Sequence, residues 1–144
     1  MVGCILTGHG QFSVGLADAL RMIGGPQEDF VVVPFLEDEA DVYPSKIRQA
    51  IEDMAKSTDE VVVFCDLVGG TPFNQSMLVS AEMSNVEVVA GTNLPMLLEC
   101  LCTRDDSTKA AQMADMATES GRMGIDHIVL EVEDDEDEDF TDGI

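Results

Sequence analysis

Short, continuous apolar runs alternate with segments of helical periodicity along most of this chain. The runs lie at residues 2–6, 30–35, 61–65 and 86–90, and they are rich in valine and other strand-forming residues. Nearly every position of such a run is apolar, rather than every second one, which is typical of strands covered on both faces in a parallel sheet. Strands joined through helices in this way predict βαβ units with right-handed crossovers.

Apolar residues recur at helical spacing between these runs, over residues 12–23, 47–54, 73–81, 97–101 and 110–117. Thr71 and Asn93 are candidate N-caps, and each precedes a proline in the first turn, where proline is tolerated. Over residues 126–132 apolar side chains alternate with others, the pattern of a half-buried strand at a sheet edge. We therefore expect an α/β, doubly wound, mostly parallel central sheet of about four strands with helices on both faces, plus a C-terminal edge strand.

The length of 144 residues and the 45% share of hydrophobic residues suit one compact domain. We assign residues 1–132 to that domain. Residues 133–144 hold acidic side chains and no basic ones, and we expect them to form an acidic, mobile tail. The formal net charge of −22 repels nucleic acid and anionic lipid, so neither class of partner is expected.

The apolar runs are far too short to span a bilayer, and the N-terminus lacks the pattern of a secretory signal, so no membrane insertion is expected. The four cysteines lie in apolar segments without the spacing of a zinc site. We expect reduced thiols with no metal and no cofactor. These features predict a cytoplasmic protein.

In a doubly wound sheet, ligands bind outside the carboxyl ends of the strands, so the loops that follow the strands are the candidates for chemistry. His9 stands between Gly8 and Gly10 at the end of the first predicted strand, just before a helix. Glycine on both sides allows a tight turn and close approach by another molecule. The start of the helix, near Ser13, offers free N–H groups to a phosphate.

Asp66 ends the third apolar run, so its carboxylate is expected at the same edge of the sheet as His9. A carboxylate there accepts a hydrogen bond from one imidazole nitrogen and leaves the other nucleophilic, although a loop-capping role would also suit Asp66. Gly70 allows close approach, and Thr71 brings a hydroxyl and a second helix N-terminus to the crevice. The loop at residues 91–99, an asparagine N-cap before an apolar helix, is commonplace by itself.

Together, segments 7–10, 66–74 and 91–99 resemble the motifs of the mannose-class IIA phosphocarrier proteins of the phosphoenolpyruvate-dependent sugar phosphotransferase system, in the same order and spacing. The resemblance covers residues 1 to about 132. It implies a phosphotransferase that carries a phosphoryl group on His9 as a phosphohistidine. It also implies a homodimer, a donor that is the histidine-containing phosphocarrier protein, and an acceptor that is a sugar-specific IIB component.

The resemblance further implies that Asp66 hydrogen-bonds the His9 imidazole and that Thr71 contacts the phosphoryl oxygens. An in-line transfer between two histidines needs donors for three equatorial oxygens. We expect these donors near the residues Gly10, Ser13, Gly70 and Thr71. This scheme requires no metal, and the choice of sugar is left to downstream components.

Other functions share part of the pattern. A carrier domain for a dihydroxyacetone kinase would have the same fold and chemistry with a different recipient, although its histidine loop usually looks less like Gly8-His9-Gly10. A dinucleotide-binding module would use these glycines in a GxGxxG motif, but Ser13 takes the third glycine position and His9 would project into the pyrophosphate space. A regulatory interaction role is compatible with phosphorylation, since the phosphorylated state of a carrier can report sugar supply.

Overall fold

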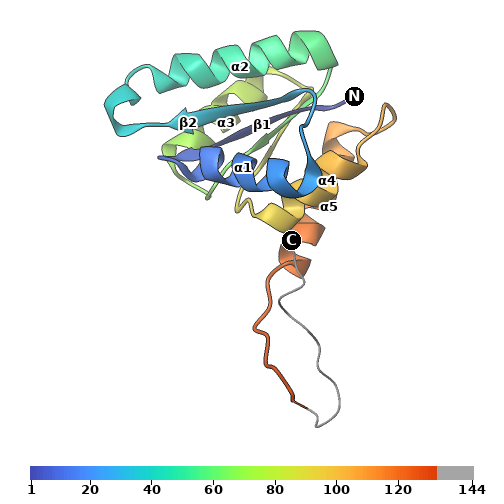
Figure 1. Ribbon diagram of the computed structural model, residues 1–144. Coiled ribbons are helices and arrows are strands. Elements are labelled where there is room, and N and C mark those ends of the chain that lie inside the picture. The colour runs from blue at the N-terminus through green and yellow to red at the C-terminus, as the bar shows by residue number, and fades with distance from the viewer. Residues whose placement is uncertain (133–144) are drawn as a thin grey trace.

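The computed structural model describes residues 1–132, and its centre is a sheet of four parallel strands (Figure 1). The strands are β1 (Gly3–His9), β2 (Phe30–Phe35), β3 (Val61–Phe64) and β4 (Val86–Val89). Their order in the sheet is β2-β1-β3-β4, so the direction of winding reverses between β1 and β3. The carboxyl ends of β1 and β3 therefore form the topological switch point of the sheet.

Five α-helices cover the sheet in the described part of the chain, and a short 3-10 turn, η1 (Glu37–Glu39), follows β2. The helices are α1 (Phe12–Gly24), α2 (Tyr43–Thr58), α3 (Thr71–Glu82), α4 (Leu94–Thr103) and α5 (Ala110–Met123). Helices α2 and α3 lie on one face of the sheet, and α1, α4 and α5 lie on the other (Figure 1). The doubly wound α/β fold expected from the sequence is confirmed.

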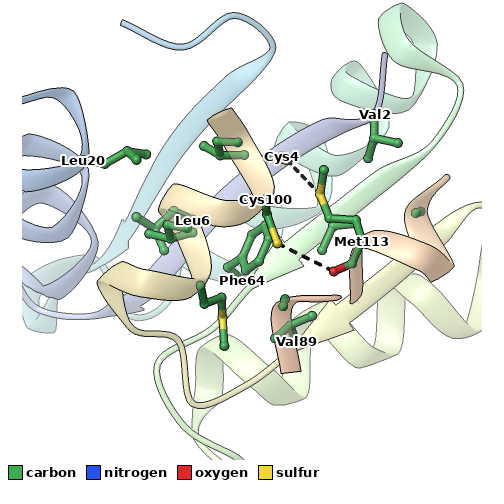
Figure 2. Packing of buried hydrophobic residues seen from close by; sticks show 14 residues of the cluster. Val2, Cys4, Leu6, Leu20, Phe64, Val89, Cys100 and Met113 are labelled. Carbon is green, nitrogen blue, oxygen red and sulfur yellow. Dashed lines mark hydrogen bonds between the residues drawn. The ribbon is translucent and has the colours of Figure 1, made fainter. Parts of the chain in front are cut away.

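Alternate side chains of the central strands enter two separate cores. Cys4 and Leu6 of β1 pack towards α1, α4 and α5, whereas Ile5, between them, packs towards α2 and α3. All three are 0% exposed, which explains why the strand is apolar at successive positions. Figure 2 shows the first core, where the Cys4 thiol lies 3.6 Å from the Met113 sulfur. Burial there raises the pKa of the Cys4 thiol to about 12, so this cysteine acts as a small hydrophobic residue.

The ends of the elements follow local rules that the sequence displays. The Asn93 side chain caps α4 by accepting a hydrogen bond from the Met96 N–H at 3.1 Å, as expected. At α3 the N-cap is Gly70 rather than Thr71, which becomes the first helical residue, ahead of Pro72. This shift by one position places the Gly70 backbone, instead of a side chain, at the mouth of the helix.

The C-terminal edge strand expected over residues 126–132 is not shown. The segment has no regular structure after Gly124 and runs away from the sheet (Figure 1), with Leu130 61% and Val132 80% exposed. An edge strand needs a neighbouring strand to pair its N–H and C=O groups, and this segment meets none in the described part of the chain. The tail expected at residues 133–144 lies outside the described residues.

Candidate functional site

His9 is the last residue of β1, and the chain turns sharply immediately after it. Gly10 has φ +56°, a conformation that L side chains rarely adopt, and its N–H donates to the Phe35 carbonyl at 2.8 Å. The turn directs the chain into α1, which begins at Phe12. The His9 side chain is 47% exposed, so the imidazole is open to another molecule at the edge of the sheet.

Asp66 follows β3 at the same edge, and one of its carboxylate oxygens contacts His9 at two atoms. Oδ2 of Asp66 accepts the His9 backbone N–H at 2.9 Å and lies 2.7 Å from Nδ1 of the imidazole. The other oxygen, Oδ1, accepts the Leu67 N–H at 2.9 Å. Because an ionised carboxylate only accepts hydrogen bonds, Nδ1 carries the proton, and Nε2 of the neutral ring keeps its lone pair.

The charge of Asp66 is stabilised by the same contacts. Burial by itself would raise the pKa of the Asp66 carboxyl, since its side chain is only 9% exposed. The hydrogen bonds from the His9 backbone, the His9 ring and the Leu67 N–H outweigh burial, and the pKa lies below its ordinary value. Asp66 is therefore ionised at neutral pH and holds one tautomer of His9.

Two glycines let these groups meet. A Cβ atom at Gly70 would lie 2.6 Å from Cε1 of His9, so only glycine lets the loop after β3 touch the imidazole. A Cβ atom at Gly8 would lie 2.6 Å from the Phe12 ring and 3.1 Å from the Asp66 side chain. Neither position has room for a side chain next to the imidazole and its carboxylate, so glycine is what the packing requires at both.

The remaining expected phosphoryl-binding residues lie around this centre. Gly10 is the neighbour of His9, and Thr71 follows Gly70 as the first residue of α3. Ser13 differs, because it is 0% exposed in the first turn of α1 and its Oγ is buried without a hydrogen-bond partner. The structure thus joins His9, Asp66 and Gly70 directly and leaves the Ser13 hydroxyl beneath the surface.

Sequence reasoning missed one residue that contacts His9. The Phe35 ring lies at 87° to the imidazole, with the two ring centroids 5.5 Å apart. The available signal was positional: Phe35 ends the second apolar run, so it lies opposite His9 in the parallel register of β1 and β2. An apolar residue at the end of a strand is ordinary in a sheet, so its contact with His9 becomes evident only from the strand register.

The geometry bears on which ligands the edge would accept. The imidazole and its carboxylate lie at the switch point of the sheet, where a dinucleotide would need room for its pyrophosphate. Among residues 1–132, no three His, Cys, Asp or Glu side chains gather where they would hold a metal ion. Over the same residues, no helix combines the length and apolar character that crossing a membrane demands.

Comparisons with known proteins agree on one family. The model of the family described as PTS system fructose IIA component matches residues 3–118. The fructose-specific EIIA component of Bacillus subtilis is 36% identical over 106 residues, which cover 73% of this chain and 72% of that protein. The mannose-specific EIIAB component of Escherichia coli is 30% identical over 125 residues, 86% of this chain but only 38% of that longer protein.

Solved structures give the same result. The EIIA component from Streptococcus agalactiae superposes with a TM-score of 0.79 at 31% identity, over 88% of this chain and 97% of that one. The mannose/sorbose-specific IIA subunit from Enterococcus faecalis superposes with a TM-score of 0.81 at 26% identity, over 91% of this chain and 97% of that one.

Proposed function

Because the chain belongs to the fructose/mannose IIA family of the sugar phosphotransferase system, and is thus a phosphotransferase that works through a phosphohistidine, we propose that His9 is the residue that carries the phosphoryl group. The observation that carries this assignment is the 2.7 Å contact between Nδ1 of His9 and Asp66. In the neutral ring this contact places the proton on Nδ1 and leaves the lone pair on Nε2, the atom that acts as the nucleophile, and the side chain is 47% exposed.

The transfer follows from this arrangement. Nε2 of His9 attacks the phosphorus of a phosphohistidine on the donor protein, the new N–P bond forms, and the old N–P bond breaks with its electron pair returning to the donor imidazole. Asp66 keeps the proton on Nδ1 and compensates the positive charge that develops on the His9 ring. The reverse sequence of bond changes delivers the phosphoryl group to the next acceptor.

Two helix N-termini flank the position that the phosphoryl group would occupy. The chain from Gly10 to Ser13 enters α1, and the chain from Gly70 to Thr71 enters α3. Free backbone N–H groups and the positive ends of the helix dipoles suit the equatorial oxygens there. We assign the Thr71 hydroxyl to the same role. For Ser13 we assign the backbone rather than the hydroxyl, because its Oγ is buried.

The partners proposed for the transfer are proteins of the same relay. Members of this family exchange phosphoryl groups with a phosphocarrier and a IIB component, and we propose the histidine-containing phosphocarrier protein as donor and a sugar-specific IIB component as acceptor. An imidazole that is 47% exposed at the edge of the sheet suits exchange between proteins better than an enclosed small-molecule pocket would. The relay operates in the cytoplasm in this proposal.

We also propose that two copies of the chain pair through residues 126–132. Strand β4 ends the sheet, so one of its edges has no strand beside it in the described part of the chain. Ile128, Leu130 and Val132 are 71%, 61% and 80% exposed, a costly arrangement for a strand-forming segment in water. Addition of this segment to β4 of a second copy would bury the apolar residues of the segment. It would also pair the open edge of β4 in each of the two copies.

Sedimentation of the intact chain and of a version ending at Gly124 tests this, and a monomeric intact protein at micromolar concentration would refute the dimer.

The proposed role of His9 is tested by substitution, with the other histidine of the chain, His127, as the control. The chain contains two histidines, and His127 lies in the exposed C-terminal segment. Incubation with phosphoenolpyruvate and the two general proteins of the phosphotransferase system should label wild type and His127→Ala equally and leave His9→Ala unlabelled. Transfer that survives His9→Ala would show that the carrier residue lies elsewhere.

A further inference from the structure

An aromatic side chain outside the proposed phosphoryl-binding residues contacts the His9 ring. Phe35 ends β2 directly opposite His9, and the two residues are joined through the Gly10 N–H, which donates to the Phe35 carbonyl at 2.8 Å. The rings stand nearly perpendicular, at 87° with centroids 5.5 Å apart, one of the arrangements that aromatic pairs prefer. Phe35 thus contacts this part of the chain twice, with its carbonyl at Gly10 and with its ring at the His9 imidazole.

Phe35 is held in turn by a buried tyrosine. The Tyr43 ring lies 4.9 Å from the Phe35 ring at 71°, and Tyr43 is only 1% exposed at the start of α2. The Tyr43 hydroxyl lies 2.6 Å from Oγ1 of Thr7, and that oxygen donates to the Val33 carbonyl, also at 2.6 Å. A threonine hydroxyl has one proton, so Tyr43 must donate to Thr7. Burial raises the pKa of the Tyr43 hydroxyl well above its ordinary value, which keeps this donor protonated at any physiological pH.

This chain of contacts restrains a motion that one hydrogen bond resists only weakly. Asp66 holds the side chain at Nδ1, so the imidazole can still rock through small rotations about its Cα–Cβ and Cβ–Cγ bonds. Such rocking would move Nε2 out of line with the attacked phosphorus. Gly70, from the loop after β3, contacts the ring, and Phe35 approaches from β2, the strand on the other side of β1. Together they limit the rocking.

We propose that Phe35, locked in place by Tyr43 and Thr7, is a positioning residue that sets the plane of the His9 imidazole for phosphoryl transfer. This inference rests on the proposed role of His9. The buried hydrogen bond between Tyr43 and Thr7 then acts on the site indirectly, by holding Phe35 against the His9 ring, although neither Tyr43 nor Thr7 contacts Nε2.

Three substitutions test the chain of contacts. Phe35→Leu removes the ring beside His9, and misplacement of a reacting group should slow single-turnover transfer on the order of ten-fold or more. Tyr43→Phe keeps both aromatic rings and removes only the hydroxyl that binds Thr7, so a smaller but distinct slowing is expected. Phe35→Tyr retains the ring and should restore most of the rate. Phe30→Leu is the matched control, because Phe30 begins the same strand and packs in the other core, next to α1, α4 and α5.

A second readout reports the ring itself. The chain has two histidines, so the carbon-bound ring protons of His9 are easily followed by NMR, with His127 as an internal reference. Tyr43→Phe should shift the His9 signals and leave those of His127 unchanged. Slower transfer together with this shift supports the proposal, provided that Phe30→Leu changes neither.

The outcomes separate this inference from the role of His9. Unshifted His9 signals in Tyr43→Phe, or rates in the Phe35 and Tyr43 variants no slower than in Phe30→Leu, would overturn the positioning role while His9 phosphorylation stands. Slow transfer that simply follows a lower melting temperature, with unshifted signals, would overturn it as well. If wild type accepts no phosphoryl group, the proposed function fails, and the NMR comparison still decides whether Tyr43 and Phe35 orient the ring.

Discussion

Gly70→Ala adds a single methyl group against the His9 imidazole and should slow phosphoryl transfer on the order of a hundred-fold while the fold is kept. The added Cβ would lie 2.6 Å from Cε1 and 3.3 Å from Nε2, whereas ordinary contacts begin at 3.4 Å. Restoring an ordinary contact from 2.6 to 3.4 Å requires the ring and the loop to separate by about 0.8 Å, and the side chain of His9 moves more easily than the backbone of the loop. A displacement of this size moves Nε2 out of its in-line position and strains the 2.7 Å contact between Nδ1 and Asp66.

The backbone of Gly70 tolerates the change, because its φ of −79° and ψ of 169° suit any L residue. Loss of activity would therefore report the ring and not misfolding. Gly15→Ala is the matched control: it makes the same chemical change in α1, and its Cβ would meet nothing within 4 Å. The assay is rapid-quench transfer from the phosphorylated donor protein, with the melting temperature of each variant measured by circular dichroism. Transfer by Gly70→Ala at the rate of Gly15→Ala would refute the placement of the ring against Gly70.

Three further predictions concern Asp66 and the tail. Asp66→Asn should keep the fold and slow single-turnover transfer about ten- to hundred-fold, as for other partners that orient a histidine, and an unchanged rate would reduce Asp66 to a loop cap. Because the folded-state pKa of Asp66 lies below its ordinary value of 3.8, the carboxylate contributes stability above about pH 4 that is lost as the pH falls through the folded-state value. Urea unfolding from pH 6 to pH 3 should therefore show wild type losing its advantage over Asp66→Asn in acid, and a constant difference would argue against an ionised Asp66 carboxylate in the folded protein. A chain that ends at Val132 should be phosphorylated as fast as the intact chain, and a large loss of rate would mean that residues 133–144 act at the site.

The sheet could be predicted well because each strand is a short, continuous apolar run and such runs recur along the chain. Residues 30–35 are apolar throughout and form β2 with those bounds, and Val61 begins β3 as expected. Strand β3 is buried at all its positions, which leaves no place for a polar side chain, whereas β2 at the sheet edge is only partly buried, with Val31 41% exposed. The segment 126–132 has an equally clear alternating pattern but forms no strand, since pairing requires a neighbour that the pattern does not supply.

At the site, the sequence predicted which residues meet but not how they are held. His9 ends β1 and Asp66 follows β3, and parallel strands bring their carboxyl ends to one edge, so the contact between the two residues follows from topology. The use of one Asp66 oxygen for both the ring and the backbone of His9 depends on side-chain geometry that no spacing encodes. The burial of Ser13 is set by which face of α1 packs on the sheet, and the Phe35 contact by register.

The most direct test of the central claim is to identify the phosphorylated nitrogen. Protein labelled with ¹⁵N in its two histidines and phosphorylated through the donor relay would be examined by NMR under alkaline conditions, where phosphohistidine persists. The account predicts a phosphoryl group on Nε2 of His9, with Nδ1 still hydrogen-bonded to Asp66. A phosphoryl group on Nδ1 of His9, or on His127, would contradict it.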